Sequence, residues 1–336
     1  MEFKGMGLGL SFFPFFLCFL CRSCFSSIRD DNIDLTMKET GSLNFLVVGD
    51  WGRKGNYNQT KVAYQMGRIG EELQVEFIVS TGDNFYEDGL TGVADKSFRE
   101  SFSDIYTAKS LQKPWYAVLG NHDYRGDVLA QLSPILRGLD HRWNCRRSFT
   151  LKRSFAAGSV DLFFVDTTPF VSKYWKHPNK DTYDWRGVAP REAYISRQLK
   201  ELAEGLKAST ATWKIVIGHH TIRSVGHHGD TEELLQQLLP ILETYNVDLY
   251  INGHDHCLEH IKSVTSDLQF LTSGAGSKSW RGIDKNANMK GLEMYYDGQG
   301  FMSLQITSTN IQAAFYDIEG TVIHQVDLYK SLLQKY

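Results

Sequence analysis

Five short blocks of this sequence combine glycine with side chains that can bind metal ions. Each block follows an apolar run, as Phe77-Ile78-Val79 precedes the first of them. The blocks are Gly82-Asp83-Asn84-Phe85-Tyr86, Gly49-Asp50-Trp51-Gly52, Gly120-Asn121-His122-Asp123, Gly218-His219-His220 and Gly253-His254-Asp255-His256. Such apolar runs predict buried strands, and a glycine permits a sharp turn after each strand. Because ligands gather at the carboxyl ends of strands in open α/β sheets, the blocks predict one shared site.

The blocks together offer seven candidate metal ligands with oxygen and nitrogen donors. They are Asp50, Asp83, Tyr86, Asn121, His219, His254 and His256. One ion in a site with open positions uses about three or four protein ligands. Seven donors, one of them shared, therefore fit two adjacent ions. Taken singly, each residue has an ordinary alternative as a turn, core or surface residue. The ordered repetition of the blocks favours the metal site.

The five blocks resemble the signature of the metallophosphoesterases, and Tyr86 narrows the resemblance to the purple acid phosphatases. The short chain, with Gly-Asp-Trp-Gly first and Gly-His-Asp-His last, resembles their low-molecular-weight type. The segments Gly218-His219-His220 and Arg223-Ser224-Val225-Gly226-His227-His228-Gly229 resemble its plant branch. The resemblance covers about Asn44 to the C-terminus. It implies a four-layer α/β/β/α metallophosphoesterase sandwich of two mixed β-sheets flanked by helices. Strand–helix alternation followed by a run of strands favours the same α/β class.

The resemblance also implies a role for each ligand. Asp83 would bridge two ions. Asp50, Tyr86 and His256 would complete the shell of one ion, and Asn121, His219 and His254 that of the other. An anionic phenolate favours Fe(III), whereas the second ion could be Zn(II), Mn(II) or Fe(II). Neighbours on an extended backbone point to opposite sides, so only one of His219 and His220 can face the ions. The match favours His219, and His220 would pack or bind groups that support the site.

Two histidines outside the ligand set are candidates for catalysis. His122 follows a ligand, and His228 matches the family's histidine in the loop after His219; its neighbour His227 is the alternative. The implied reaction is hydrolysis of a phosphate monoester to an alcohol and inorganic phosphate. Metal-activated hydroxide would attack phosphorus, and His228 with His122 would protonate the leaving alkoxide. Asp123 would orient His122 or organise a turn, and Asp166 would serve a turn or support the site.

Two other functions remain open at this point. One is a different metallophosphoesterase, such as a phosphodiesterase or a phosphoprotein phosphatase, against which Tyr86 argues. The other is a secreted binding protein with an inert metal site. A net charge of −3 argues against non-specific binding to nucleic acid or acidic membranes. We expect a monomer that acts on small phosphomonoesters and releases inorganic phosphate.

The N-terminal residues predict a targeting segment rather than part of the fold. Leu8–Cys21 is almost wholly apolar and is followed by small residues, which predicts a secretory signal peptide over residues 1–26. An uncleaved anchor is the alternative, although the run is short for a membrane span. Residues 27–43 are expected to form a flexible lead-in, and residues 44–336 one catalytic domain.

A secreted protein, whether extracellular, in the cell wall or vacuolar, would carry two further features. Asn58-Gln59-Thr60 matches a glycosylation acceptor, although Asn58 could also cap the next helix. Once the leader has been removed, Cys145 and Cys257 are the remaining cysteines. They could form a disulfide near the site or stay as free, buried thiols.

Overall fold

Two mixed β-sheets form the centre of the computed structural model, which describes residues 33–35, 41–155, 158–176 and 181–330. The eight-stranded sheet has the order β1 (Ile33–Leu35), β6 (Phe149–Phe155), β7 (Gly158–Phe164), β8 (Trp213–Ile217), β9 (Leu249–Asn252), β11 (Gln269–Ser273), β10 (Leu258–Lys262), β12 (Leu292–Tyr296). The seven-stranded sheet has the order β15 (Val322–Tyr329), β14 (Asn310–Asp317), β13 (Gly300–Ile306), β2 (Leu43–Val48), β3 (Phe77–Ser80), β4 (Trp115–Ala117), β5 (Trp143–Cys145). The parallel run β7–β8–β9–β11 occupies the middle of the eight-stranded sheet, and the parallel run β2–β3–β4–β5 forms one side of the seven-stranded sheet, with β5 at its edge.

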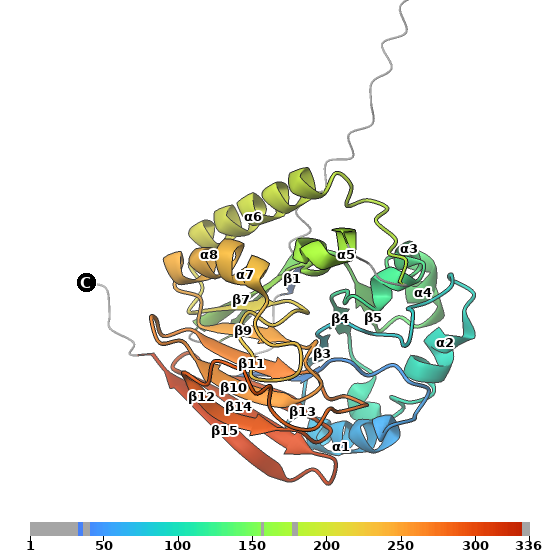
Figure 1. Cartoon of the computed structure of the whole chain (residues 1–336). Helices are drawn as coiled ribbons and strands as arrows, with labels where there is room; N and C mark the ends of the chain where they lie inside the picture. Colours follow the sequence, from blue (N-terminus) through green and yellow to red (C-terminus); the bar gives the residue numbers. More distant parts are fainter. Residues whose placement is uncertain (1–32, 36–40, 156–157, 177–180, 331–336) are drawn as a thin grey trace, which may run out of the picture. The chain divides into compact units, whose positions relative to one another are not determined.

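Helices cover the outer faces of the two sheets (Figure 1). The longest are α1 (Gln59–Glu72), beside the seven-stranded sheet, and α6 (Arg191–Ala208), beside the eight-stranded sheet together with α7 (Glu232–Gln237) and α8 (Leu239–Thr244). The shorter ones are α2 (Lys96–Phe98), α3 (Val128–Gln131), α4 (Pro134–Leu139) and α5 (Ser172–Lys176), with single turns at Arg99–Ser103, Lys109–Leu111, Asp123–Arg125 and Thr168–Phe170. The four-layer α/β/β/α arrangement predicted above is confirmed.

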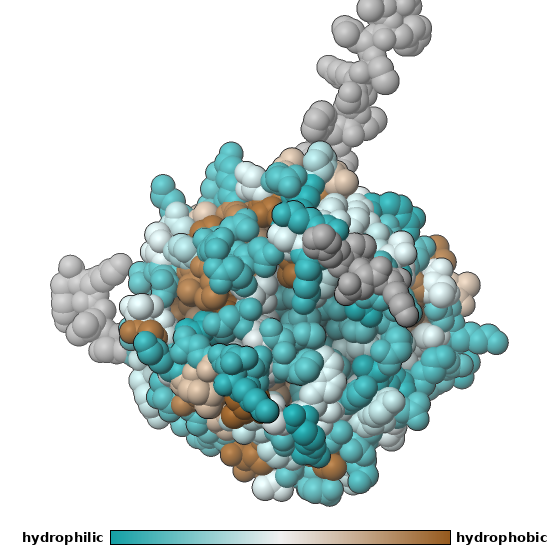
Figure 2. All heavy atoms as spheres, in the orientation of Figure 1, coloured by the Kyte–Doolittle hydropathy of each residue, from teal (hydrophilic) through white to brown (hydrophobic). Residues whose placement is uncertain are grey.

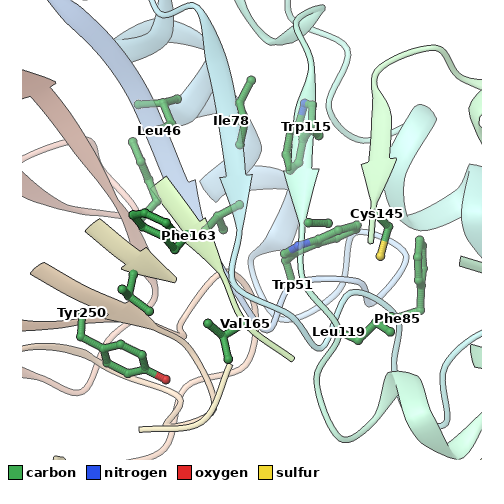
Figure 3. Close-up of a cluster of buried hydrophobic side chains, with 14 of the residues drawn as sticks. Leu46, Trp51, Ile78, Phe85, Trp115, Leu119, Cys145, Phe163, Val165 and Tyr250 are labelled. Carbon is green, nitrogen blue, oxygen red and sulfur yellow. The ribbon is translucent and has the colours of Figure 1, made fainter. Parts of the chain in front are cut away.

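The alternation of side chains along the strands explains the layers. In β2, Phe45 and Val47 join the core between the sheets, whereas Leu46 and Val48 pack in the core that includes α1. A strand buried on both faces reads as a continuous apolar run, as this one does. Figure 3 shows Leu46, Ile78 and Trp115 on three neighbouring strands of this second core. The face of the molecule in Figure 2 is mainly hydrophilic, with apolar side chains in small groups.

Trp51 ties the first block to that core. Its indole N–H donates to Ser80 Oγ at 2.8 Å, and its ring makes edge contacts with Tyr106 and Trp115 at 5.4 and 6.0 Å. The loop that carries Asp50 is thereby fixed to the end of β3.

Several local predictions differ from the structure. The apolar spacing of Val128–Leu136 predicts one helix, but the structure divides this segment, because Pro134 occupies the first turn of α4 with Ser133 as its N-cap. The apolar spacing of Glu232–Leu242 also predicts one helix, and Pro240, in the first turn of α8, divides it. Strands β5, β10 and β12 were not predicted. Strand β1 lies within residues 27–43, where a flexible lead-in is expected, and pairs in parallel with β6.

The remaining predictions about single residues have mixed outcomes. Asn58 is the N-cap residue of α1, as predicted, and its backbone carbonyl accepts from Val62 N–H at 2.9 Å. It has a left-handed conformation, with φ of 64°, and its side chain makes no capping bond. Cys145 and Cys257 are free and buried, which excludes the disulfide. The predicted signal peptide lies outside the described residues. Within the described residues, no helix is long and apolar enough to cross a membrane.

Candidate metal centre

All five blocks lie just beyond the carboxyl ends of parallel strands. Strands β2, β3 and β4 of one sheet lead to Asp50, Asp83 with Tyr86, and Asn121. Strands β8 and β9 of the other sheet lead to His219, and to His254 with His256. Six of the seven side chains are buried, and Tyr86 is half-buried. The structure therefore brings the whole predicted set together, with the oxygen donors on one sheet and the imidazoles on the other.

The backbone of the site is tightly constrained. Asp50, Asp83 and His254 have φ of 60°, 48° and 71°, a left-handed conformation that side-chain-bearing residues rarely adopt. Such residues cost about 1–3 kcal/mol each and concentrate at functional sites. Two glycines are required by close approach: a Cβ on Gly120 would lie 2.2 Å from Asp83 Oδ1, and one on Gly253 would lie 2.4 Å from Asp50 Oδ2.

One group of donors surrounds the Tyr86 hydroxyl. This oxygen lies 2.9 Å from Asp50 Oδ1, 2.9 Å from Asp83 Oδ2 and 3.0 Å from His256 Nε2. His256 Nε2 is itself 3.4 Å from Asp50 Oδ1. Burial, together with the charges of Asp50 and Asp83, raises the pKa of Tyr86 well above its ordinary value.

A second group of donors surrounds His219 Nε2. This nitrogen lies 3.3 Å from Asn121 Oδ1, 3.2 Å from His254 Nδ1 and 3.4 Å from Asp83 Oδ1. The other ring nitrogen of His219 faces the backbone carbonyl of Thr81 at 2.9 Å, which fixes the ring. Asp83 therefore directs one oxygen at each group.

The donor set fits metal cations. Tyr86 has a single hydroxyl hydrogen, so it can donate to only one of the two buried carboxylates at a time. Positive charge between these oxygens would satisfy both carboxylates and favour the phenolate. Carboxylates, a phenol, an amide oxygen and imidazoles are ligand types that suit iron, zinc and manganese.

His220 lies closer to this cluster than the alternation of a strand predicts. Strand β8 ends at Ile217, so the alternation does not extend to His220, and its ring centroid lies 4.3 Å from that of His254. Both of its ring nitrogens nevertheless have partners, Thr167 Oγ1 at 3.0 Å and the Tyr174 hydroxyl at 3.1 Å. These bonds leave His219 as the histidine of this pair whose ring faces the other donors.

The two candidate catalytic histidines lie on different groups. The His122 ring lies 4.4 Å from the Tyr86 ring, and its Nδ1 contacts the backbone carbonyl of Glu87. The His228 ring stacks on His254 at 4.0 Å with an interplanar angle of 15°. His227 is exposed and contacts Trp280 and His228. The geometry thus favours His228 over His227.

Two buried aspartates organise the loops around the site. Asp255 accepts bonds from the backbone N–H of His228 at 2.7 Å and of Gly229 at 3.2 Å, and from the Ser224 hydroxyl at 2.6 Å. It therefore anchors the loop that carries His228. Asp123 accepts bonds from the backbone N–H groups of Asn84, Phe85 and Gly120. It organises the turn, and the prediction that it orients His122 is not supported by these bonds.

Asp166 belongs to a separate buried network. Its carboxylate accepts from the Tyr194 hydroxyl at 2.9 Å and from Tyr124, and it pairs with Arg147 at 3.3 Å. It supports the loop after β7 rather than binding at the cluster.

Sequence reasoning missed two residues that cover the cluster. Trp280 stacks flat on His256, with centroids 4.0 Å apart and an interplanar angle of 5°. The Arg53 guanidinium carbon lies 3.6 Å from the centroid of the Tyr86 ring. Tryptophan and arginine are not typical metal ligands, and both residues lie outside the five blocks. The sequence pattern therefore did not indicate them.

Comparisons with known proteins agree with this geometry. The family model for calcineurin-like phosphoesterases matches residues 43–258. Purple acid phosphatase 3 of Arabidopsis thaliana is 61% identical over 288 residues, which cover 85% of this chain and 78% of that protein. The chain belongs to the purple acid phosphatase family. Human tartrate-resistant acid phosphatase type 5 is 32% identical, with 86% and 91% of the two chains covered.

Solved structures share the fold of this purple acid phosphatase. GAP50, described as the anchor in the inner membrane complex of Plasmodium, matches with a TM-score of 0.75 at 26% identity and covers 87% of this chain and 90% of its own. The purple acid phosphatase PPD1 from yellow lupin seeds matches with a TM-score of 0.60 at 13% identity, covering 87% and 55%. Because its sequence relatives are purple acid phosphatases and its metal-ligand residues lie together, the protein is a phosphomonoester hydrolase of the dinuclear-metal type.

Proposed function

We propose that this enzyme hydrolyses phosphate monoesters at the cluster of seven donors. In this proposal Asp50, Tyr86 and His256 hold Fe(III), Asn121, His219 and His254 hold a divalent ion, and Asp83 is shared. The observation that carries the assignment is the position of Asp83, whose two oxygens face the two groups separately. The phenol in the first group favours the harder ion there.

When bound, the two ions supply Lewis acidity for the phosphate oxygens and for the water that attacks phosphorus. The chain's own residues then have to orient the ester and move a proton. His228 is suited to the second task, because its ring lies against His254 and the residue is exposed. In this proposal the exposed imidazole donates its proton to the leaving alkoxide of the bound ester.

The electrostatic setting of His228 makes its proton depend on the substrate. The packing of the ring against His254 and Trp280 removes part of its hydration and, together with the charge of Lys173, lowers the pKa of His228 to about 3. An anionic phosphate ester beside the ring would oppose this shift and favour the imidazolium. We therefore propose that His228 is charged chiefly when substrate is present, with His122 assisting from the Tyr86 side.

We also propose that the protein is secreted, to the extracellular space, cell wall or vacuole, as a glycosylated monomer. Half-exposed Asn58 would be the acceptor. Glycosidase treatment of the secreted protein should lower its apparent mass, and Asn58→Gln should abolish that change. An unchanged mass after treatment would remove Asn58 as a glycosylation site.

The deciding experiment combines metal analysis, a visible spectrum and substrate comparison on the purified protein. We expect two metal ions per chain, one of them iron, a violet absorption band and faster hydrolysis of monoesters than of diesters. Tyr86→Phe should lose most of the band and keep the fold. An unchanged band with full iron in Tyr86→Phe would place the phenolate elsewhere, and a preference for diesters would support a phosphodiesterase.

A further inference from the structure

We propose that Arg53 is a positioning residue for Tyr86, and that its charge sets the electron density of the phenol ring. The inference rests on the proposed role of Tyr86 as an iron ligand. In this role Arg53 would tune the colour and the reduction potential of the bound iron without contacting it.

The guanidinium faces the ring rather than the phenol oxygen. Its carbon lies 3.6 Å from the Tyr86 ring centroid, well inside the limit of about 6 Å for a cation–π contact. The Arg53 side chain is only 6% exposed, so water screens this contact little. Its Nε is buried and has no hydrogen-bond partner among the described residues. The guanidinium therefore meets the π face at the expense of a full set of hydrogen bonds.

The surrounding loop holds Arg53 in this position. The fully buried Gln59 accepts bonds through Oε1 from the backbone N–H of Arg53 at 3.0 Å and of Gly55 at 2.7 Å. Its amide group donates to the carbonyl of Ser101 at 2.8 Å. The turn after the Asp50 block is thus fixed to the helical segment that contains Ser101, and Arg53 leaves it at a defined angle.

Among the described residues, Glu87 is the carboxylate that pairs with the guanidinium. Arg53 Nη1 pairs with Glu87, the residue that directly follows Tyr86 in the chain. The Glu87 side chain is 65% exposed. The cation is therefore buried against the ring, while its counter-ion lies toward water. Changes in Glu87 alter the net charge felt by the ring without touching the ring itself.

The physical consequence concerns the phenolate form of Tyr86. A cation over the ring face stabilises an electron-rich ring more than a neutral one. Moving an electron from the ring to the metal then requires more energy, so the absorption band lies at shorter wavelength. The same positive charge favours the less charged, reduced state of a nearby iron, which raises its reduction potential.

Two charge-changing variants test the inference. Arg53→Met should move the visible band to longer wavelength and make the reduction potential more negative. Glu87→Gln should move both quantities in the opposite directions, because it removes the counter-charge of Arg53. Arg53→Lys, which keeps the charge but not the planar group, should fall between wild type and Arg53→Met. Lys54→Met is the matched control, since Lys54 is the exposed neighbour that pairs with Glu100 at 2.9 Å; it should leave the band unchanged.

The outcomes separate this inference from the proposal on which it rests. Arg53→Met with full iron and an unshifted band would overturn the inference alone. Shifts of the same sign in Arg53→Met and Glu87→Gln would also overturn it, because they would indicate a merely structural role. A wild-type protein without iron, or a band that survives Tyr86→Phe, would overturn the proposed role of Tyr86 and the inference with it.

Discussion

The two halves of the candidate metal centre differ in charge and in what covers them. The half around Tyr86 contains the carboxylate of Asp50 and the phenol, and the permanent cation of Arg53 lies over its ring. The half around His219 contains an amide and two imidazoles besides the shared Asp83, and the imidazole of His228 lies over it. A guanidinium cannot release its proton, whereas an imidazole can. The difference suggests that the first half holds a highly charged ion and the second handles the substrate's proton.

Removing the shared ligand Asp83 should affect both halves of the metal centre, and we expect the largest effect on metal content and activity from this change. Asp83→Ala takes away the oxygen that faces Tyr86 and the one that faces His219. Replacing a residue that only supports a metal ligand alters metal affinity or activity by about 10–100-fold. The loss of activity in Asp83→Ala should therefore exceed about 100-fold. Metal analysis of the purified variant should show both ions depleted. Retention of one ion at full occupancy would show that Asp83 is not shared.

Ligands that belong to a single half should separate the ions. We expect Asn121→Ala to lose chiefly the divalent ion and His256→Ala chiefly iron, since their side chains lie in different groups. Element analysis of the two variants, prepared in parallel, measures this directly. Equal depletion of both elements in both variants would contradict the partition.

His228, which lies over the half around His219, should matter for proton transfer. General acid catalysis contributes about 10²–10⁴-fold, and mainly for poor leaving groups. His228→Ala should therefore slow alkyl phosphate hydrolysis by a factor in this range and activated aryl phosphate hydrolysis far less. The exposed neighbour variant His227→Ala is the matched control and should change neither rate appreciably. Equal slowing of both substrates by His228→Ala would assign His228 to phosphate binding and make His122 the better candidate acid.

The stability of the loop that carries His228 should also depend on pH, and we expect this effect to be the smallest. Glu259 accepts the backbone N–H of Val225 in the loop before His228, and burial raises the pKa of Glu259 from 4.5 to about 8. Between these values the folded state binds more protons than the unfolded state, so the free energy of unfolding falls as pH rises. This stabilisation is complete below about pH 4.5 and is lost as pH rises through about 8.

Glu259→Gln keeps the shape of the neutral acid and removes its titration. The decrease in Tm between pH 5 and pH 8 should therefore be smaller in this variant than in wild type. Glu204→Gln, on the exposed face of α6, controls for the loss of one negative charge. A variant that loses as much Tm as wild type over this range would show that Glu259 does not titrate in the folded protein.

The fold and the seven candidate ligands could be predicted because both depend on local patterns. An apolar run followed by glycine and a ligand residue specifies a strand end, and the Asp83 and His254 blocks illustrate this. The short strands β10 and β12 escaped prediction because their pairing partners, not their composition, define them. Arg53 and Trp280 escaped for a similar reason. Their roles arise from which ring each side chain lies against, and that depends on tertiary contacts between separate loops.

The origin of the donors from two different sheets has a consequence for biosynthesis. Every oxygen donor follows a strand of the seven-stranded sheet, and every imidazole follows a strand of the eight-stranded sheet. During translation, Asp50, Asp83 and Asn121 are therefore synthesised before His219 and His254. Before the second sheet docks, the partial site would offer oxygen donors alone, which suit magnesium or calcium as well as iron. In the proposed metal centre, selection of the ions would therefore depend on completed folding, and a bound ion would hold the two layers together.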